Sequence, residues 1–389
     1  MEIRKITPEE DIYSERVSSV AYFWKLDKVR ERGARLTDVW GGFDKNGGLC
    51  SRMILEDYPV RFDGHTVKMC GIGGVATLPD HRNERLVRGM FEKALPDMKE
   101  RGYLLTFLFP FSFVFYRKFG YELCYAHNRV TIPAGALKTF KTSGGFEMYQ
   151  PGGDFTPFMS IYEKFVEGKN LSVVRDAAAW ESILNHDPYA TNRVAYINAR
   201  NGGGAYILFD AEGYRFGEPN SLRVTEIAWT DAVYMYDLFG FLNVFGSQFE
   251  KIIWKAPDGF NAQAYFPENG DVAVTRDASA MGRVTDVPRA LESLKTPERA
   301  GRAIIQISDE IIASNSGSYE LEWGGGASSV KKTGREADLV TDIRAFSQLA
   351  TGFLSFEQAK LLPNVKITGN AESLRALFPG KELYMRESF

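Results

Sequence analysis

The amino-acid sequence predicts an α/β protein with mixed sheets that ends in a small α+β domain. Residues 1–130 alternate strand-like and helix-like stretches, and a similar order starts again near residue 150. Beyond residue 300, strands come first and helices follow. A chain of 389 residues also exceeds one ordinary hydrophobic core. We therefore expect three domains, at residues 1–150, 151–275 and 281–389.

Turn and helix signals place the elements of the first domain. Thr7 is a suitable N-cap for a helix that Pro8 opens. Asp63-Gly64 is typical of a hairpin turn, and Gly120 of a left-handed helix end. Pro96 is expected to kink or shorten the helix that contains it. The predicted strands are Ile3–Ile6, Val39–Phe43, Leu49–Phe62, Thr66–Thr77, Tyr103–Leu108 and Tyr121–Val130, with helices around Leu86–Met98 and Ser112–Phe119.

The second domain is predicted as a divergent copy of the first, although the pattern alone leaves this open. Its strands are expected at Arg193–Asn198, Tyr206–Phe209, Leu222–Ala228 and Ile252–Lys255, with a long helix, Asp231–Phe249, before the last. Residues 267–300 contain three prolines and show little periodicity, so we expect a domain boundary there. In the third domain, strands over 303–341 precede helices at Asp342–Thr351, Ser355–Leu362 and Ala371–Phe378.

Composition excludes several classes of function. The formal net charge is −3, from 47 basic and 50 acidic residues, which gives no electrostatic reason to expect nucleic acid or a membrane as a partner. Three well-separated cysteines and four histidines predict neither a disulfide framework nor a metal site. The N-terminus has no apolar signal region, and no apolar run reaches the length of a membrane helix. We expect a cytoplasmic protein.

One strand–loop–helix junction carries the clearest functional signal. The strand that ends near Pro79 leads into a short polar loop, and a helix begins close to Arg85. Unpaired amides at a helix N-terminus, together with arginines, form a phosphate-binding arrangement. An ordinary surface turn whose arginines only solvate the helix end remains the alternative.

A second motif indicates which kind of phosphate-containing ligand the junction would bind. Phe115-Tyr116-Arg117-Lys118-Phe119-Gly120-Tyr121 follows that junction and resembles the C-terminal half of the GNAT acetyltransferase fold. The turn Pro79-Asp80-His81-Arg82, the stretch 281–291 and the chain end 384–389 are similar to the enhanced-intracellular-survival group of that superfamily. The resemblance implies an active GNAT domain, a second GNAT-like domain without a cofactor, and a sterol-carrier-like C-terminal domain. It also implies a homo-oligomer, which is a hexamer in that group.

The resemblance implies acetyl-CoA as the co-substrate and assigns the residues around it. Val75 and Thr77 would pair with the pantetheine arm, and the loop would wrap the pyrophosphate. The residues assigned to the pyrophosphate are Arg82, Asn83, Arg85, Leu86, Val87 and Arg88. Arg85 stands where the family pattern has glycine, which lets backbone approach phosphate closely. Its side chain either pairs with phosphate or fills the groove. In the second copy, Ala228-Trp229-Thr230-Asp231 occupies the matching place and contains no arginine.

Two groups are assigned to catalysis by the same resemblance. Tyr116 matches the family's general acid, although an aromatic core role is the alternative on spacing alone. The family's base is the free carboxylate of the last residue, here Phe389, whereas most chain ends are frayed. The acceptor would be a small cationic amine, such as an aminoglycoside, a polyamine or a lysine. The competing class is an acyl-CoA or lipid-binding protein with a degenerate GNAT site.

Overall fold

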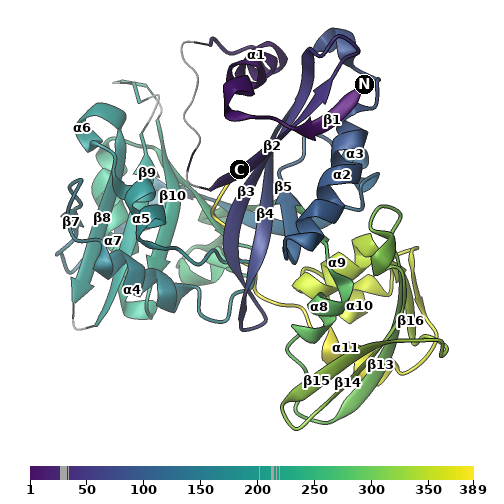
Figure 1. The fold of residues 1–389 in the computed structure, drawn as a ribbon. Helices are drawn as coiled ribbons and strands as arrows, with labels where there is room; N and C mark the ends of the chain where they lie inside the picture. The colour runs from purple at the N-terminus through teal and green to yellow at the C-terminus, as the bar shows by residue number, and fades with distance from the viewer. Residues whose placement is uncertain (27–32, 34, 201, 212–213, 216, 219) are drawn as a thin grey trace. The chain divides into compact units, whose positions relative to one another are not determined.

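The computed structural model describes residues 1–26, 33, 35–200, 202–211, 214–215, 217–218 and 220–389 (Figure 1). The chain forms two compact units. Unit one contains Met1–Tyr125, Ser279–Lys381 and Glu387–Phe389, and unit two contains Ala126–Ala278 and Glu382–Arg386. The C-terminal residues are therefore divided between the units.

A mixed sheet forms the first part of unit one. Its strand order is β1-β2-β3-β4-β5-β12, in which β4 and β5 are parallel and the other neighbours are antiparallel. The strands are β1 Glu2–Lys5, β2 Leu36–Phe43, β3 Leu49–Phe62, β4 His65–Thr77, β5 Leu105–Leu108 and the end of β12 Ala273–Val284. The bounds of β3 coincide with the predicted strand. The mixed α/β class of the fold is confirmed.

Helices α1 Asp11–Tyr22, α2 Leu86–Glu100 and α3 Phe113–Arg117 accompany this sheet (Figure 1). Thr7 and Glu10 form a capping box at a short 3₁₀ turn, Pro8–Glu10, that leads into α1. Helix α2 continues to Glu100, so the prediction that Pro96 shortens the helix is wrong. Met98, beyond the proline, is buried, and its packing stabilises the last turn.

Residues 267–300, where we expect a domain boundary, contain regular elements. Strand β12 and helix α8 Val287–Glu292 lie there, and Met281–Val284 pair with β5. Ala280 through Thr285 are all buried, so this part of β12 shows no alternation of apolar and polar residues. A strand buried on both faces loses the period that identifies strands in a sequence.

A second sheet in unit one has the order β15-β14-β13-β16-β17, and helices α9 and α10 lie over it (Figure 1). As predicted, most of its strands precede its helices. The elements are β13 Gly301–Ser308, β14 Gly317–Gly324, β15 Ala327–Thr333, β16 Leu339–Asp342, α9 Ile343–Thr351, α10 Phe356–Ala359, β17 Val365–Ile367 and α11 Ala371–Leu377.

Unit two repeats the strand–helix–strand plan of the first sheet. Its strand order is β6-β11-β10-β9-β8-β7, and the parallel pair β10–β11 is connected by α7, just as β4–β5 is connected by α2. Its elements are β6 Glu122–Pro133, β7 Glu147–Met148, α4 Thr156–Phe165, α5 Ala177–Leu184, α6 Pro188–Thr191, β8 Arg193–Arg200, β9 Gly203–Asp210, β10 Ser221–Trp229, α7 Ala232–Leu242 and β11 Lys251–Pro257. Among the residues that the structure describes, no helix is both long and apolar enough to cross a membrane.

Candidate functional site

Strands β4 and β5 separate part-way along their length. Their parallel pairing covers Met69–Ile72 on β4 and Leu105–Leu108 on β5. Strand β4 continues to Thr77, so its last residues present backbone groups at an edge that β5 does not cover. Backbone N–H and C=O groups at such an edge are available to an extended ligand that adds like a strand.

A β-bulge re-aims this part of β4. The register with β3 shifts between Arg52 and Ile54, so Gly74 and Val75 together oppose Met53. Gly74 has a φ of 54°, which favours glycine. The buried Arg52 donates to the Gly74 carbonyl over 3.3 Å and to Glu15 over 2.9 Å, which ties α1 to the bulge.

The bulged edge opens into a cavity of about 1080 Å³. The wall contains the end of β4, the loop around a short 3₁₀ turn, η2 Pro79–His81, and the first turn of α2. All eight residues predicted to hold the cofactor line this one cavity: Val75, Thr77, Arg82, Asn83, Arg85, Leu86, Val87 and Arg88. Aromatic and basic side chains also line the cavity, namely Phe111, Phe115, Lys118 and Phe119.

The loop end of the cavity favours anions. The side chains of Arg82 and Arg85 are exposed, and neither has a carboxylate partner within the described part of the chain. Glu84 is held by His81, with 3.0 Å between its carboxylate and Nδ1. The first turn of α2 contains no acidic residue, and its amides have no intrahelical acceptors. Phosphate oxygens would meet both kinds of donor here.

Tyr116 does not form part of the cavity wall. It lies on α3, is 3% exposed, and packs edge-on against Phe91, Phe111 and Phe115. Burial raises the pKa of its hydroxyl, and the nearby Tyr22 contributes to the same shift. Tyr22 itself lines the cavity, so the phenol of Tyr116 lies close to that wall.

The chain terminus lies against β4. The ring of Phe389 packs on those of Tyr58 and Phe109, with ring centroids 5.4 and 5.1 Å apart. A Cβ added at Gly71 would lie 2.6 Å from the ring, and one added at Gly73 would lie 2.7 Å from the terminal carboxyl carbon. The terminal carboxylate therefore lies where β4 leaves β5, two residues along the strand from Val75.

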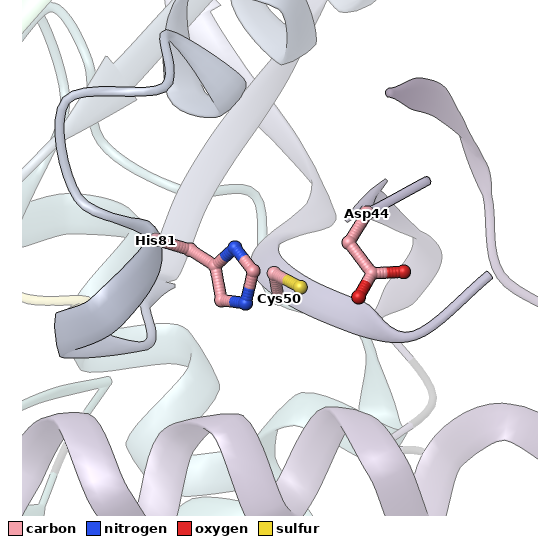
Figure 2. A group of neighbouring side chains, drawn as sticks. All are labelled: Asp44, Cys50 and His81. Carbon is pink, nitrogen blue, oxygen red and sulfur yellow. The ribbon is translucent and has the colours of Figure 1, made fainter. Parts of the chain in front are cut away.

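Two features of the site escape sequence reasoning. The Tyr22 hydroxyl donates to the Val75 carbonyl over 2.8 Å, so it occupies a group at the open edge. Asp44 and Cys50, which flank one hairpin turn, lie together with His81 from η2 (Figure 2). No local spacing signals either feature, because Tyr22 and His81 each contact residues from distant segments of the chain.

Comparison with known families agrees with this geometry. Residues 2–124 match an acetyltransferase (GNAT) domain, residues 171–284 match a second acetyltransferase (GNAT) domain, and residues 287–386 match a sterol carrier protein domain. The chain is a GNAT-type N-acetyltransferase. The predicted order of two GNAT domains and a sterol carrier protein domain is confirmed. Acetyl-CoA is the co-substrate that GNAT domains imply.

Solved structures share the fold of this acetyltransferase over its whole length. A probable N-acyltransferase from Enterococcus faecalis is 19% identical with a TM-score of 0.83, and the alignment covers 100% of this chain and 99% of the other. A GCN5-related N-acetyltransferase from Anabaena variabilis is 18% identical with a TM-score of 0.85, covering 100% of both chains. Eis1 from Mycobacterium abscessus is 18% identical with a TM-score of 0.79, again covering 100% of both. No sequence among the curated proteins matches this chain.

Proposed function

We propose that the first GNAT domain transfers the acetyl group of acetyl-CoA to a primary amine of a small cationic acceptor. Aminoglycosides, polyamines and lysine side chains are the acceptor classes. The observation that carries the proposal is the arrangement along β4, where a cavity lined by arginines lies at one end of the open edge and the terminal carboxylate at the other. A thioester held along this edge would meet an amine held by the carboxylate, and transfer would be direct within a ternary complex.

The parts of acetyl-CoA would bind in sequence along the cavity, from the loop to the open edge of β4. Arg82, Arg85 and the first amides of α2 would hold the pyrophosphate, and Arg88 would lie one turn further along the helix. The pantetheine arm would pair with the edge at Val75 and Thr77 as an added strand. Tyr22 would have to release the Val75 carbonyl for this pairing to form.

Tyr116 would act as the general acid. Its raised pKa keeps the phenol protonated across the neutral range. A thiol has a pKa of about 8.5 and an ordinary tyrosine one of about 10, so a phenol is a suitable donor to the departing thiolate. Because burial widens this gap, the developing thiolate would be stabilised first by a hydrogen bond from Tyr116 and would complete its protonation from water.

The carboxylate of Phe389 would hold the acceptor. An α-carboxyl pKa of about 3.5 against an amine pKa of about 10 makes direct proton abstraction uphill by about 9 kcal/mol. The carboxylate is therefore better suited to anchor an ammonium group, with water carrying its proton, unless desolvation raises the pKa of the carboxylate enough to make it a base. Phe389 packs directly against Gly71 and Gly73, so its carboxylate cannot move closer to β4.

The second GNAT domain would bind no cofactor. At the N-terminus of α7, where the first domain has arginines, the Asp231 carboxylate accepts from the amides of Val233 and Tyr234 over 2.9 and 3.3 Å. These amides are thereby occupied, and a negative charge stands where a pyrophosphate would bind.

A thiol-release assay tests the function. Full-length protein is mixed with acetyl-CoA and, in turn, spermidine, an aminoglycoside and a lysine peptide, and free CoA thiol is measured against time. We expect release that saturates in both substrates for at least one amine. Binding of acetyl-CoA without amine-dependent release would instead support a binding protein, and the absence of both would remove the cofactor assignment.

A further inference from the structure

Three side chains with metal-binding atoms meet beside the cofactor loop. Asp44 lies in the turn between β2 and β3, Cys50 on β3, and His81 in η2. One ligand atom from each lies within 4.8 Å of the other two (Figure 2). In Figure 2 the imidazole of His81 lies beside the sulfur of Cys50, with the carboxylate of Asp44 on the other side of the sulfur.

Each of the three groups is held in place by its neighbours. Oδ1 of Asp44 accepts from the amides of Asn46 and Gly48 over 2.8 and 2.7 Å, which fixes the carboxylate and leaves Oδ2 for another partner. Cys50 is 3% exposed and its sulfur lies 3.2 Å from the Gly48 carbonyl, within the same turn. Such preorganisation lowers the cost of ligating an ion.

The imidazole of His81 has the outer partner that a ligating histidine needs. Glu84 lies 3.0 Å from Nδ1, so the proton of a neutral imidazole is held on that nitrogen. The lone pair is then on Nε2, which is 3.8 Å from a carboxylate oxygen of Asp80. A carboxylate on one nitrogen and a metal on the other is the usual arrangement around metal-bound histidine.

Negative charge gathers around the sulfur. The carboxylate of Asp44 lies in the same group as the sulfur, and those of Glu84 and Asp80 lie 3.0 and 3.8 Å from the imidazole of His81. A divalent cation at this place would offset those charges and would favour the thiolate. The three donors combine sulfur, nitrogen and oxygen, a set that zinc accepts in tetrahedral sites and that magnesium and calcium do not select.

We propose that Asp44, Cys50 and His81 bind one zinc ion, with Asp80 or a water molecule as the fourth ligand and Glu84 as the outer partner of His81. The ion would join the β2–β3 turn to the loop that follows β4. Because His81 also lines the cofactor cavity, the ion would place positive charge beside the proposed pyrophosphate site. This last consequence rests on the proposed function; the metal site itself does not.

Cobalt provides a direct test, because thiolate ligation gives Co²⁺ an intense charge-transfer band in the near ultraviolet. Tag-free, full-length protein is stripped with a chelator, dialysed and titrated with Co²⁺, and Zn²⁺ is then added. We expect a band that saturates at one equivalent and is displaced by zinc. Absence of the band at excess cobalt overturns the site.

Matched variants separate this site from adventitious binding. Cys50→Ser should abolish the band, whereas Cys124→Ser, which changes a buried thiol elsewhere, should retain it. Glu84→Gln leaves all three ligands in place and should weaken zinc about 10- to 100-fold. A band that survives Cys50→Ser overturns the proposal. If Cys50→Ser fails to fold, His81→Gln decides the question by the same readout, since the His81 side chain is less buried than that of Cys50.

Coupling to the cofactor is measured separately. Calorimetric titration of acetyl-CoA into zinc-loaded and stripped protein should show tighter binding in the loaded form, and acetyl-CoA should tighten zinc by the same factor. Equal affinities would overturn the coupling. A protein that binds zinc but no acetyl-CoA in either state would contradict the cofactor assignment and leave the metal site standing.

Discussion

At the scale of single residues, the loop of the cofactor cavity is strained in an unusual way. Asn83 and Arg85 both have positive φ, at 73° and 61°. Asparagine tolerates this conformation, but for arginine the left-handed region costs about 1–2 kcal/mol. The side chain of Arg85 is exposed and lines the cavity. The unfavourable backbone conformation of Arg85 therefore places a positive charge at the cavity. This favours phosphate pairing over a filled groove.

Replacing Arg85 by glycine should therefore separate stability from binding. We expect Arg85→Gly to raise the free energy of unfolding by about 1 kcal/mol, because glycine adopts positive φ without a Cβ clash. The affinity for acetyl-CoA should fall about 5- to 10-fold, since a charge-assisted contact is lost. Thermal denaturation and calorimetric titration measure the two effects. Arg82→Ala, at a residue with φ of −65°, is the control and should weaken binding without the gain in stability. Tighter binding by Arg85→Gly would show that the arginine obstructs the groove.

The hydroxyl of Tyr116 is the second change at this scale. Tyr116→Phe keeps the buried ring and its aromatic contacts, so the fold should be little affected. Turnover should fall about 10²-fold, which is a usual size for the loss of a general acid. Tyr121→Phe serves as the control, because that hydroxyl is also buried but bonds to Thr106 over 3.1 Å. Equal turnover of Tyr116→Phe and the wild type would return Tyr116 to the aromatic core.

At the scale of elements, the C-terminal segment is held at two places. In unit two, the Tyr384 hydroxyl donates to the buried Glu226 over 3.0 Å, and Arg386 lies 3.2 Å from the same carboxylate. In unit one, Phe389 packs on two aromatic rings. A terminus with these contacts differs from the frayed chain ends that are common in proteins.

Extending this segment should abolish transfer. A residue added after Phe389 converts the carboxylate into a neutral amide and moves the charge away by about 3.5 Å or more. We expect a C-terminal tag to eliminate turnover while acetyl-CoA still raises the melting temperature, and an N-terminal tag to have no such effect. Gly73→Ala tests the same position with an intact terminus, because its Cβ would meet the carboxyl carbon at 2.7 Å. Gly334→Ala, which would add a Cβ to open space, is its control. Equal rates for both tagged forms would exclude the carboxylate.

The sequence predicts elements well where their signals are local. The bounds of β3 coincide with the predicted ones, and Gly120 has the expected positive φ. The eight residues proposed to hold the cofactor line one cavity because they lie on one strand, one loop and one helix turn that follow each other in the chain. The position of Phe389 against β4 and the approach of His81 to Asp44 and Cys50 could not be predicted, because they depend on contacts between segments distant in the chain. The end of β12 could not be recognised as a strand, because its burial on both faces removes the alternation of apolar and polar residues.

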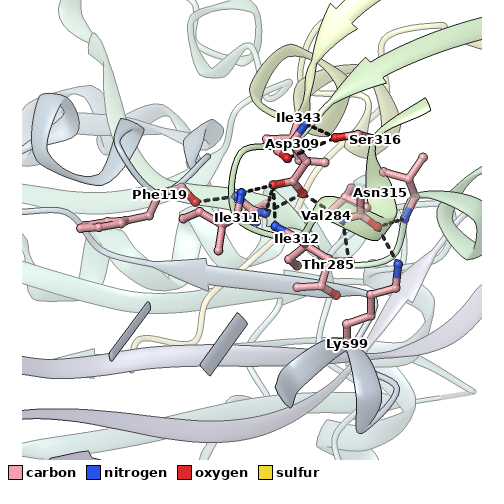
Figure 3. A network of polar contacts seen from close by, with 12 residues as sticks. Lys99, Phe119, Val284, Thr285, Asp309, Ile311, Ile312, Asn315, Ser316 and Ile343 are labelled. Carbon is pink, nitrogen blue, oxygen red and sulfur yellow. Dashed lines mark hydrogen bonds and ion pairs between the residues drawn. The ribbon is translucent and has the colours of Figure 1, made fainter. Parts of the chain in front are cut away.

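At the scale of the whole molecule, a buried ion pair joins the first GNAT domain to the sterol carrier protein domain within unit one. Arg283 at the end of β12 lies 2.6 Å from Asp309, and neither side chain is exposed. Arg283 also donates to the Phe119 carbonyl over 2.5 Å. Figure 3 shows Asp309 at the centre of this network, with its carboxylate accepting from the amides of Ile311 and Ile312 and from the amide side chain of Asn315.

The ion pair gives Gly120 a second role beyond ending α3. A Cβ added at Gly120 would lie 1.9 Å from a guanidinium nitrogen of Arg283. The glycine of the Phe-Tyr-x-Lys-x-Gly motif thus makes room for the residue that connects the two domains. In this chain, the segment that presents Tyr116 is therefore held on its other side by the sterol carrier protein domain.

Breaking this pair should destabilise both domains together. Asp309→Asn leaves the Arg283 guanidinium buried without a full counter-charge, and losing one partner of a buried pair costs about 3–5 kcal/mol. We expect a single calorimetric transition at a clearly lower temperature, because the two domains share the network. The control is Glu372→Gln, whose partner Arg299 lies 3.4 Å away in a pair that is 89% and 84% exposed, so the change should be within about 0.5 kcal/mol. The double variant Arg283→Met/Asp309→Leu should not recover the loss, since the amides of Ile311 and Ile312 and the side chain of Asn315 would lose their buried acceptor. If Asp309→Asn altered stability no more than the exposed control, the two domains would be held together by apolar packing and not by this pair.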